Sequence, residues 1–334
     1  MEKAKYHHLI PQTYLSSWAN EHGSLQIEYI NDIGRLQIRN KSNIAGINDY
    51  YSIRAGMASC SKKDAEIIFA SLSDYTVICG GEVITNPLKM NELFWRFDEW
   101  EIFRKDGTIV SKKKLKHEIK QKKIKDIETE WNRQYEYKWQ DVLTKIQTEV
   151  LHTTSNTVPS FEKNYLMLFF TALNWRGFRS NDHFEDFYSK LTSGLLSDIL
   201  IPESERLLPM IKTAKDEIKH DYLIKTYRKF LNYDGVMYKQ ALIFLERANF
   251  HFLIADKNSQ FITCDSPAFE IVRHDGYKEG IMPISPSILL TIGKCTNDQN
   301  KYYISRINEK GVSYYNKIIK LHAYEFSVIP YNDN

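Results

Sequence analysis

The chain has 334 residues, of which 43% are hydrophobic and 26% are charged, and its formal net charge is +3. These values describe a folded chain with a substantial core and exclude a solvated, disordered one. The near balance of charge gives no argument for a nucleic-acid or membrane partner by itself, and the length allows one large domain or two.

Other features of the sequence indicate a cytoplasmic protein. The longest apolar run, about residues 165–175, is shorter than the roughly 20 residues that a membrane-spanning helix needs. The N-terminus lacks the apolar core of a signal peptide, so we expect no membrane anchor. The cysteines are far apart in the sequence, as expected for reduced thiols rather than a zinc ribbon. They are Cys60, Cys79, Cys264 and Cys295.

The first part of the chain predicts short strands and two helices. Pro11 favours a helix start, and apolar residues that alternate on both sides of a turn at Asn31–Gly34 predict a hairpin. Gly80 would end a helix. The expected elements are a helix at about 12–20, a hairpin at 25–38, a strand at 50–53, a helix at 62–79 and a hairpin at 100–110.

The middle of the chain is predicted to be a helical block. From Lys112 to about Val150 the sequence is strongly charged, and its apolar residues recur at helical spacing. A turn-rich break at Ser155–Pro159 follows. Further helices are expected at about 161–175, 182–200, 203–231 and 235–247.

After residue 248 the period of the apolar residues changes from about 3.6 to about 2, which indicates strands. No glycine-rich phosphate loop follows a strand, so a Rossmann or Walker nucleotide site is not expected. Strands are expected at about 250–255, 260–264, 268–272, 287–292, 301–305 and 324–329, with one helix at 308–320.

This order of elements predicts an α+β fold, with N-terminal and C-terminal antiparallel strands around a central helical block. We expect a single domain over residues 1–334. Its strand-rich N-terminal part covers 1–111, its helical part covers 112–247, and its strand-rich C-terminal part covers 248–334.

Two histidines and a proline precede the first expected helix. Histidine is the usual general acid or base and a common metal ligand, because its ordinary pKa is about 6.5. Pro11 would hold His8 and Gln12 at a helix start, where unpaired backbone amides favour anions. The alternative is that His7 and His8 only pack against the helix or cap it.

Arg176 and Arg179 lie three residues apart at the end of a helix that is expected to be buried. A buried guanidinium without a partner is costly, so Arg176 needs either a carboxylate partner or an anionic ligand. The sequence leaves a structural bridge and a ligand site equally open.

Asp265 ends an apolar strand, and Pro267 prevents that strand from continuing. A carboxylate at a strand end can orient a histidine, pair with an arginine or bind a metal ion. The alternative is a turn in which Asp265 accepts hydrogen bonds from nearby backbone amides.

These segments resemble the domain-of-unknown-function family 4238. The family's N-terminal pattern, with His, an aliphatic residue, Pro-Gln and aromatic residues, matches His7–Trp18 closely. In another family segment a strand is followed by Asp, then by Asn or Ser, and then by Pro, and this segment matches Phe261–Pro267. The family's downstream pattern of Pro, Leu or Ile, Ser and Pro matches Pro283–Pro286. The match at Pro283–Pro286 is moderate, as are those at Arg176–Arg179, where Gly-Phe replaces the family's Thr-Pro, and at Asn316–Ser327.

The resemblance covers about residues 6–328 and implies one evolutionary unit. It also implies that the polar residues of the motifs converge, because they lie at the ends of elements of one fold. Those residues are His8, Gln12, Arg176 and Asp265. The resemblance implies no particular activity.

A basic segment begins at Arg104 and ends at Lys125. Its lysines could contact phosphates, and the aromatic residues after it could stack on bases. The alternative is a solvated helix face. The candidate nucleic-acid-binding residues are Lys112, Lys113, Lys114, Lys116, Lys120, Lys122 and Lys123, and the candidate stacking residues are Trp131, Tyr135, Tyr137 and Trp139.

The leading expectation is a nuclease-like hydrolase that acts on a phosphodiester, in a bacterial defence or toxin setting. His8, positioned with Gln12, would be the general base. Arg176 and Arg179 would neutralise phosphate charge, and Asp265 would orient the histidine or hold a divalent ion. The candidate ligands of a magnesium or manganese ion are His7, His8 and Asp265.

Two alternatives remain open. One is a non-catalytic binding or scaffold protein in which the polar motifs are structural latches. The other is an enzyme that acts on a small phosphorylated ligand. The expected partners are nucleic acid or a protein from a defence operon, and not a membrane.

Overall fold

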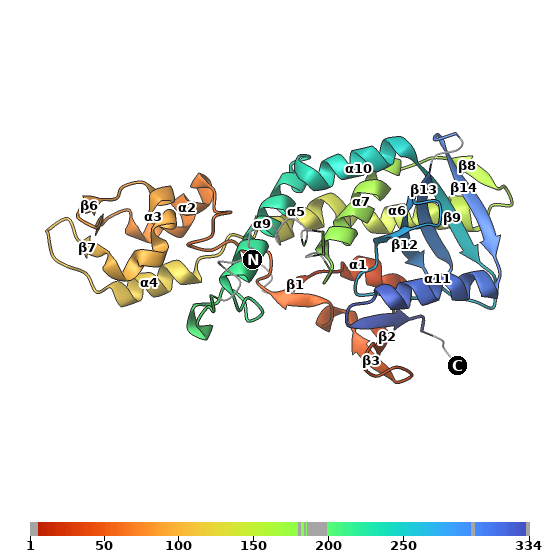
Figure 1. Ribbon diagram of the computed structural model, residues 1–334, viewed down its shortest axis with the longest axis horizontal. Helices are drawn as coiled ribbons and strands as arrows, with labels where there is room; N and C mark the ends of the chain where they lie inside the picture. The colour runs from red at the N-terminus through yellow and green to blue at the C-terminus, as the bar shows by residue number, and fades with distance from the viewer. Residues whose placement is uncertain (1–5, 180–181, 184, 186–198, 295–297, 332–334) are drawn as a thin grey trace. The chain divides into compact units, whose positions relative to one another are not determined.

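The computed structural model describes residues 6–179, 182–183, 185, 199–294 and 298–331, and the chain forms two compact units (Figure 1). Unit 1 comprises residues 1–4, 49–130 and 192–228. Unit 2 comprises residues 5–48, 131–191 and 229–334. The division falls within the helices α5 (Asp126–Trp131) and α9 (Ala214–Leu231).

The largest sheet of unit 2 has six strands in the order β11-β12-β13-β9-β14-β8. Neighbouring strands are antiparallel, except that β14 and β9 are parallel. The strands are β8 (Thr157–Pro159), β9 (Ala248–Ala255), β11 (Phe269–Val272), β12 (Lys278–Ser285), β13 (Ile288–Lys294) and β14 (Lys301–Ile307). Most residues of β9 are buried, which explains why the sequence of this strand is a nearly continuous apolar run.

Helix α11 (Glu309–His322) covers one face of this sheet. It begins where the Asn308 side chain accepts a hydrogen bond from the Gly311 amide. Val312 and Ile319 of α11 belong to the same buried cluster as Leu253 and Leu289 of the sheet.

Helix α7 (Lys163–Arg176) packs on the opposite face, where the Phe170 ring approaches Gly280, the strand partner of Ile292. Most of its residues are buried, as expected for a helix that is apolar around its circumference. Two further helices pack beside it, α6 (Tyr137–Ile146) and α10 (Gly235–Arg247).

A second sheet of unit 2 joins the N-terminal hairpin to the C-terminal strand. Its order is β10-β15-β2-β3, and all its pairs are antiparallel. The strands are β2 (Ser24–Tyr29), β3 (Leu36–Asn40), β10 (Thr263–Cys264) and β15 (Phe326–Ile329). The remaining N-terminal elements are β1 (Tyr6–His8), α1 (Gln12–Leu15), η1 (Ser16–Trp18), η2 (Lys41–Asn43) and β4 (Gly46–Asn48), which pairs with β1.

Unit 1 is built from short elements around the buried residues Phe69, Phe97 and Trp100. Ser61 and Asp64 form a capping box that starts its first helix. The elements are α2 (Lys62–Ile68), η3 (Ala70–Leu72), β5 (Thr76–Cys79), β6 (Glu82–Val83), α3 (Pro87–Glu92), η4 (Phe94–Glu99), β7 (Glu101–Phe103) and α4 (Lys112–Gln121). Its sheet has the order β6-β5-β7. A 3-10 turn, η8 (Glu203–Glu205), lies in the later segment of this unit.

The predicted α+β fold is confirmed, with several antiparallel sheets and a helical block. The hairpin predicted at 25–38 is also confirmed, as β2 and β3. The expectation of a single domain stays a prediction. Among the described residues, no helix is both long and apolar enough to cross a membrane.

Several predicted boundaries are wrong. The helix expected at 62–79 ends at Ile68, and β5 follows because its residues pair with β6 and β7. The helical run from 112 to 150 is interrupted near Ile124, which pairs with Ile53, and it continues as α5, α6 and the π-helical turns η5 (Asn132–Glu136) and η6 (Gln147–Leu151). Strand β12 was not predicted, since its glycine and proline resemble a turn. Most of the helix expected at 182–200 lies outside the described residues.

The close packing of α7 on the large sheet predicts the effect of a one-methyl substitution. A Cβ atom at Gly280 would lie 2.8 Å from the Phe170 ring, so Gly280→Ala should lower the free energy of unfolding by about 1–3 kcal/mol. Urea denaturation measures this change. Gly293→Ala, whose Cβ would meet only an ordinary contact at 3.6 Å, is the matched control and should cause no loss. Equal effects would contradict this packing.

Candidate functional site

The Arg176 side chain is almost completely buried at the end of α7, with 1% of its surface exposed. Its Nη1 donates to Oε1 of Glu136 at 2.9 Å, and its Nη2 donates to the backbone carbonyl of His8 at 2.7 Å. The guanidinium lies 4.8 Å from the ring centroid of Trp131. Of the two possibilities that the sequence leaves open for Arg176, the structure shows the carboxylate partner, which is Glu136 of the same chain.

His8 is partly buried on β1, and its Nε2 lies 3.1 Å from Nε2 of Gln12 and 3.2 Å from the carbonyl oxygen of Ser42. Burial lowers the pKa of His8, although the hydrogen bond with Ser42 opposes this shift. The imidazole is therefore neutral at pH 7. A neutral Nε2 donates to Ser42 or accepts from the Gln12 amide, according to its tautomer. His8 and Gln12 thus lie within hydrogen-bond distance of each other where the first helix begins.

Asp265 is completely buried, and its carboxylate binds backbone rather than another side chain. It accepts hydrogen bonds from the amides of Tyr324 at 2.8 Å, Glu325 at 2.5 Å and Phe326 at 3.2 Å. Burial raises the pKa of Asp265 to about 6, while the three amides oppose the shift. Asp265 therefore binds backbone amides, as in the alternative reading, but these amides are about 60 residues later in the chain, and the contact fixes the segment between α11 and β15.

Arg179 binds the start of the same segment between α11 and β15, through backbone carbonyl groups. Its Nε donates to the carbonyl of His322 at 2.8 Å, and its Nη1 pairs with Asp182 at 3.3 Å. A cation at the last carbonyls of a helix is favourable, here at the end of α11. Arg179 and Asp265 together fix residues 322–326.

The other motif residues connect the N-terminal segment to the core. The Tyr14 hydroxyl donates to the Pro283 carbonyl at 2.7 Å, and the Trp18 indole donates to the Phe261 carbonyl at 2.9 Å. A Cβ atom at Gly177 would lie 3.1 Å from Oγ of Ser266. The motif segments therefore converge in unit 2 by packing and hydrogen bonding.

A metal site does not form from the candidate ligands in the part of the chain that the structure describes. There, no three side chains of His, Cys, Asp or Glu are grouped closely enough to hold an ion. His7 is completely buried, and Asp265 binds the three amides.

The basic segment of unit 1 divides into two groups. Lys116 binds Asp98 at 2.8 Å, and Lys123 and Lys125 pair with the buried Asp49 at 2.5 Å and 3.6 Å. Lys112 donates to the backbone carbonyl of Asp98. The exposed group, which we call the α4 lysine face, consists of Lys113, Lys114, Lys120 and Lys122.

The aromatic residues after this segment cannot serve as the predicted stacking platforms. Trp131, Tyr135 and Trp139 are at most 2% exposed and belong to the core of unit 2. Tyr137 alone among the four is exposed. The prediction of stacking is wrong for the three buried residues, whose helical spacing arises from core packing.

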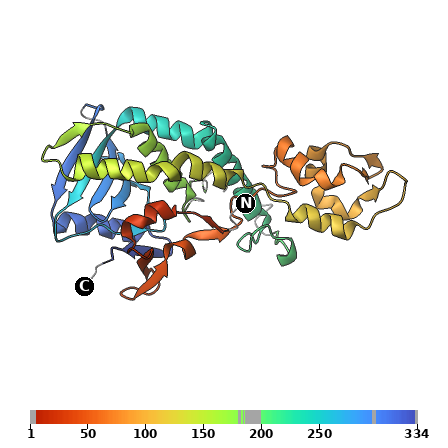
Figure 2. The ribbon, with the colours of Figure 1, turned by 180° about the vertical axis from the view of Figure 1, so that it is seen from behind.

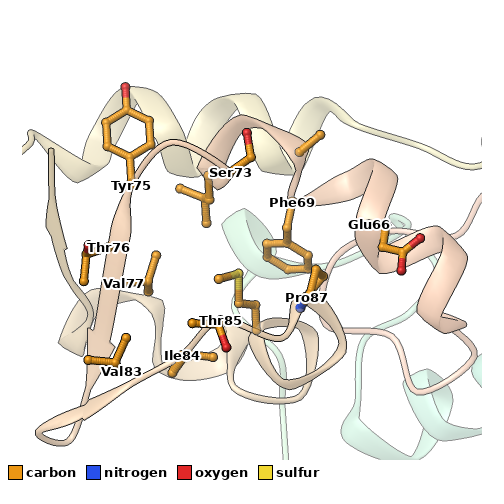
Figure 3. Close-up of a pocket in the computed structure, with 13 residues that line it drawn as sticks. Glu66, Phe69, Ser73, Tyr75, Thr76, Val77, Val83, Ile84, Thr85 and Pro87 are labelled. Carbon is orange, nitrogen blue, oxygen red and sulfur yellow. The ribbon is translucent and has the colours of Figure 1, made fainter. Parts of the chain in front are cut away.

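A pocket of about 400 Å³ opens in unit 1, and Figure 3 shows Phe69, Val77 and Ile84 on three sides of it. Glu66 lies at its margin (Figure 3). Its lining, as the structure describes it, includes no lysine or arginine, so it does not suit a phosphate. No sequence motif indicates this pocket, because its walls come from short elements with ordinary apolar residues.

Unit 2 carries a second, polar pocket of about 340 Å³. Two of the family-like segments contribute to it, one through Ser16 and Ser17 and the other through Ser285 and Pro286. Neither pocket is lined by His8, Gln12, Arg176, Arg179 or Asp265.

The chain belongs to the family described as protein of unknown function (DUF4238), whose sequence model matches residues 6–333. The predicted family is therefore confirmed over nearly the whole chain, including residues of both units. No curated protein and no solved structure is similar enough to the chain to be matched.

Substitution of Arg176 should show how much the buried ion pair with Glu136 contributes to the free energy of unfolding. Arg176→Met leaves Glu136 buried without its cation, so the free energy of unfolding should fall by about 3–5 kcal/mol. Lys301→Met removes a half-exposed pair with Asp298 at 3.6 Å and should cost at most about 1 kcal/mol. Urea denaturation compares the two, and a small loss in both variants would contradict the structural role of Arg176.

Asp265 predicts a pH dependence of stability. Its pKa in the folded protein is about 6, above the ordinary value of 3.8, so the folded state binds the proton more tightly than the unfolded state. The protonated carboxyl group of Asp265 therefore adds to the stability of the folded protein below pH 4, and this stabilisation is lost as the pH rises through 6. Relative to Asp265→Asn, the wild type should lose about 2–3 kcal/mol between pH 4 and pH 7. Parallel pH profiles of the two proteins would contradict this.

Proposed function

We propose that this chain is a non-catalytic binding protein, and that its ligand is nucleic acid held by the α4 lysine face. The observation that carries the first part is the burial of Arg176 between Glu136 and the His8 carbonyl. A guanidinium that stabilises developing phosphate charge must reach the substrate. Arg176 instead holds three segments of unit 2 together.

The other candidate catalytic residues support the same proposal. Asp265 uses both carboxylate oxygens on backbone amides, and Arg179 uses its guanidinium at the end of α11. These contacts leave neither group directed toward a phosphodiester. A buried hydrogen-bonded polar group is what stability requires, so these motif residues need no catalytic role.

The α4 lysine face supports a polyanionic ligand. Lys113 and Lys120 are seven residues apart and therefore lie on one side of α4, about 10 Å apart along the helix. Lys113, Lys120 and Lys122 have no ion pair with a described acid, and the one contact of Lys114 is distant, at 3.9 Å from Glu118. Exposed lysines bind the phosphate backbone by releasing counterions, without reading the bases.

The cysteines support a cytoplasmic location, which is part of this proposal. Cys60, Cys79 and Cys264 are free and buried, as expected for thiols in a reducing compartment.

Charge reversal on α4 tests the ligand. Lys113→Glu with Lys120→Glu should weaken binding of a fluorescein-labelled 20-nucleotide single-stranded RNA at least tenfold, as measured by anisotropy. Loss of two phosphate contacts should also reduce the slope of log K against log salt by about 1.4. The control carries the same charge change at the exposed Lys62 and Lys63 of α2 and should bind almost normally. Equal losses, or no binding by the wild type in 50 mM salt, would contradict the proposal.

A nuclease-like hydrolase remains the second candidate, and the His8–Gln12 pair is the observation that favours it. His8 is only partly buried, and its lowered pKa keeps it neutral and able to accept a proton at pH 7. Cleavage of plasmid, tRNA and total RNA, with and without magnesium or manganese, compares wild type with His8→Ala. Cleavage that His8→Ala abolishes without lowering the melting temperature would replace the binding proposal, whereas two inactive proteins would remove this candidate.

A further inference from the structure

Strand β3 is an unprotected edge of the four-stranded sheet in unit 2. It pairs with β2 and with no other described strand. Figures 1 and 2 show it at the outer margin of the sheet from both sides, with no described element beyond it. An edge strand presents a row of backbone amides and carbonyls that can pair with another strand.

The hairpin that ends in β3 also exposes a group of large aliphatic side chains. Leu36 is 50% exposed and Ile38 is 59% exposed, and both point to the same face of the sheet because they alternate with Gln37. Ile30 and Ile33, at the turn of the hairpin, are also exposed. Four exposed aliphatic residues within nine positions are a feature of interaction sites more than of free surfaces.

Two arginines flank the aliphatic residues: Arg35 comes just before the strand and Arg39 lies within it, while the residue between Leu36 and Ile38 is the neutral Gln37. Arg39 and Gln37 alternate with Leu36 and Ile38 in the strand and therefore lie on the opposite face. Arg35 pairs weakly with Asp32 at 3.6 Å, and Arg39 donates to Gln37 at 2.7 Å. Residues 33–43 contain no acid. The edge thus has one aliphatic face and one positive face.

We propose that the free edge of β3 binds an extended segment of a partner protein in which acidic and aliphatic residues alternate. The partner would add a strand to the sheet, with main-chain hydrogen bonds supplying affinity and alternate side chains supplying specificity. Its aliphatic residues would lie beside Leu36 and Ile38, and its carboxylates beside Arg35 and Arg39. Because β3 has five residues, it spans about 17 Å and matches five or six residues of the partner.

The charge on β3 selects this partner over a second copy of the chain. Antiparallel pairing of two β3 strands would bring Arg35 and Arg39 near the same residues of the other copy, and like charges across a strand pair are destabilising. Charges on an edge can also serve only to prevent pairing. Such protection does not account for the exposed Leu36 and Ile38 beside the arginines.

The test uses the full chain and a fluorescein-labelled peptide of three Glu-Val repeats, with binding measured by anisotropy. A peptide with three consecutive Glu and three consecutive Val residues has the same composition and charge but no alternation, and it should bind at least tenfold more weakly. N-methylation of alternate amides in the repeat peptide should abolish binding. Hydrogen exchange at residues 36–40 should slow when the repeat peptide is bound.

Variants of the chain locate the site. Arg35→Glu with Arg39→Glu should weaken binding of the repeat peptide at least tenfold, and Ile38→Ser should weaken it severalfold. The control pair Lys239→Glu and Lys257→Glu, on the exposed surface of unit 2, should bind normally. The double variant at Lys113 and Lys120 should also bind the peptide normally, which separates this site from the nucleic-acid proposal.

Three results would overturn the proposal. Equal binding of the two peptides would show that no strand is added. Normal peptide binding by the arginine variants would show that the peptide binds elsewhere. A concentration-dependent dimer that Ile38→Ser disrupts and the peptide does not compete with would assign the edge to a second copy instead.

Discussion

The buried charge of Arg176 is the constraint on which the rest of unit 2 depends. Its guanidinium joins three segments that are far apart in the sequence, namely β1 through the His8 carbonyl, η5 through Glu136, and α7 itself. A charge removed from water is tolerated only when it is paired and hydrogen-bonded. The three segments must therefore be in place together, which couples the N-terminal segment to the helical block.

A second set of polar contacts fixes the C-terminal end of the same fold. Asp265 binds the amides and Arg179 the carbonyls of residues 322–326. Tyr14 and Trp18 bind the backbone carbonyls of Pro283 in β12 and of Phe261, and so fix the first helices to the core. The motif residues that define the family pattern in this chain are therefore the ones that close the fold. This explains why a pattern of catalytic residue types is compatible with a binding protein.

The family resemblance implies that the polar motif residues converge, which stays a prediction, whereas the sequence itself predicted the fold class, because apolar periodicity reflects local structure. The sequence could not assign the partners of the motif residues. Glu136 lies 40 residues before Arg176 in a π-helical turn, and nothing in the local sequence distinguishes it from the solvated acids around it. The partners of Asp265 are backbone amides about 60 residues later, which no side-chain pattern reveals. Likewise, helical spacing identified Trp131 and Trp139 but could not tell a buried stripe from an exposed platform.

Because the side chains of Arg176, Asp265 and Arg179 make contacts within the protein, the binding of a partner under our proposals depends on other, exposed residues. Among the described residues, the two surfaces that we propose for recognition are the exposed lysines of α4 in unit 1 and the edge of β3 in unit 2. The two proposed sites differ in kind, since the first would attract phosphate charge without requiring a particular ligand geometry, and the second would require a partner with an extended backbone.

The most direct measurement replaces the whole buried pair with apolar residues, in the double variant Arg176→Met with Glu136→Leu. If the pair is structural, the double variant should regain most of the stability that Arg176→Met loses, and it should bind RNA with the affinity of the wild type. A double variant that is folded and stable but has lost RNA binding, or has lost an RNA-cleaving activity that the wild type shows, would contradict the structural role assigned to Arg176.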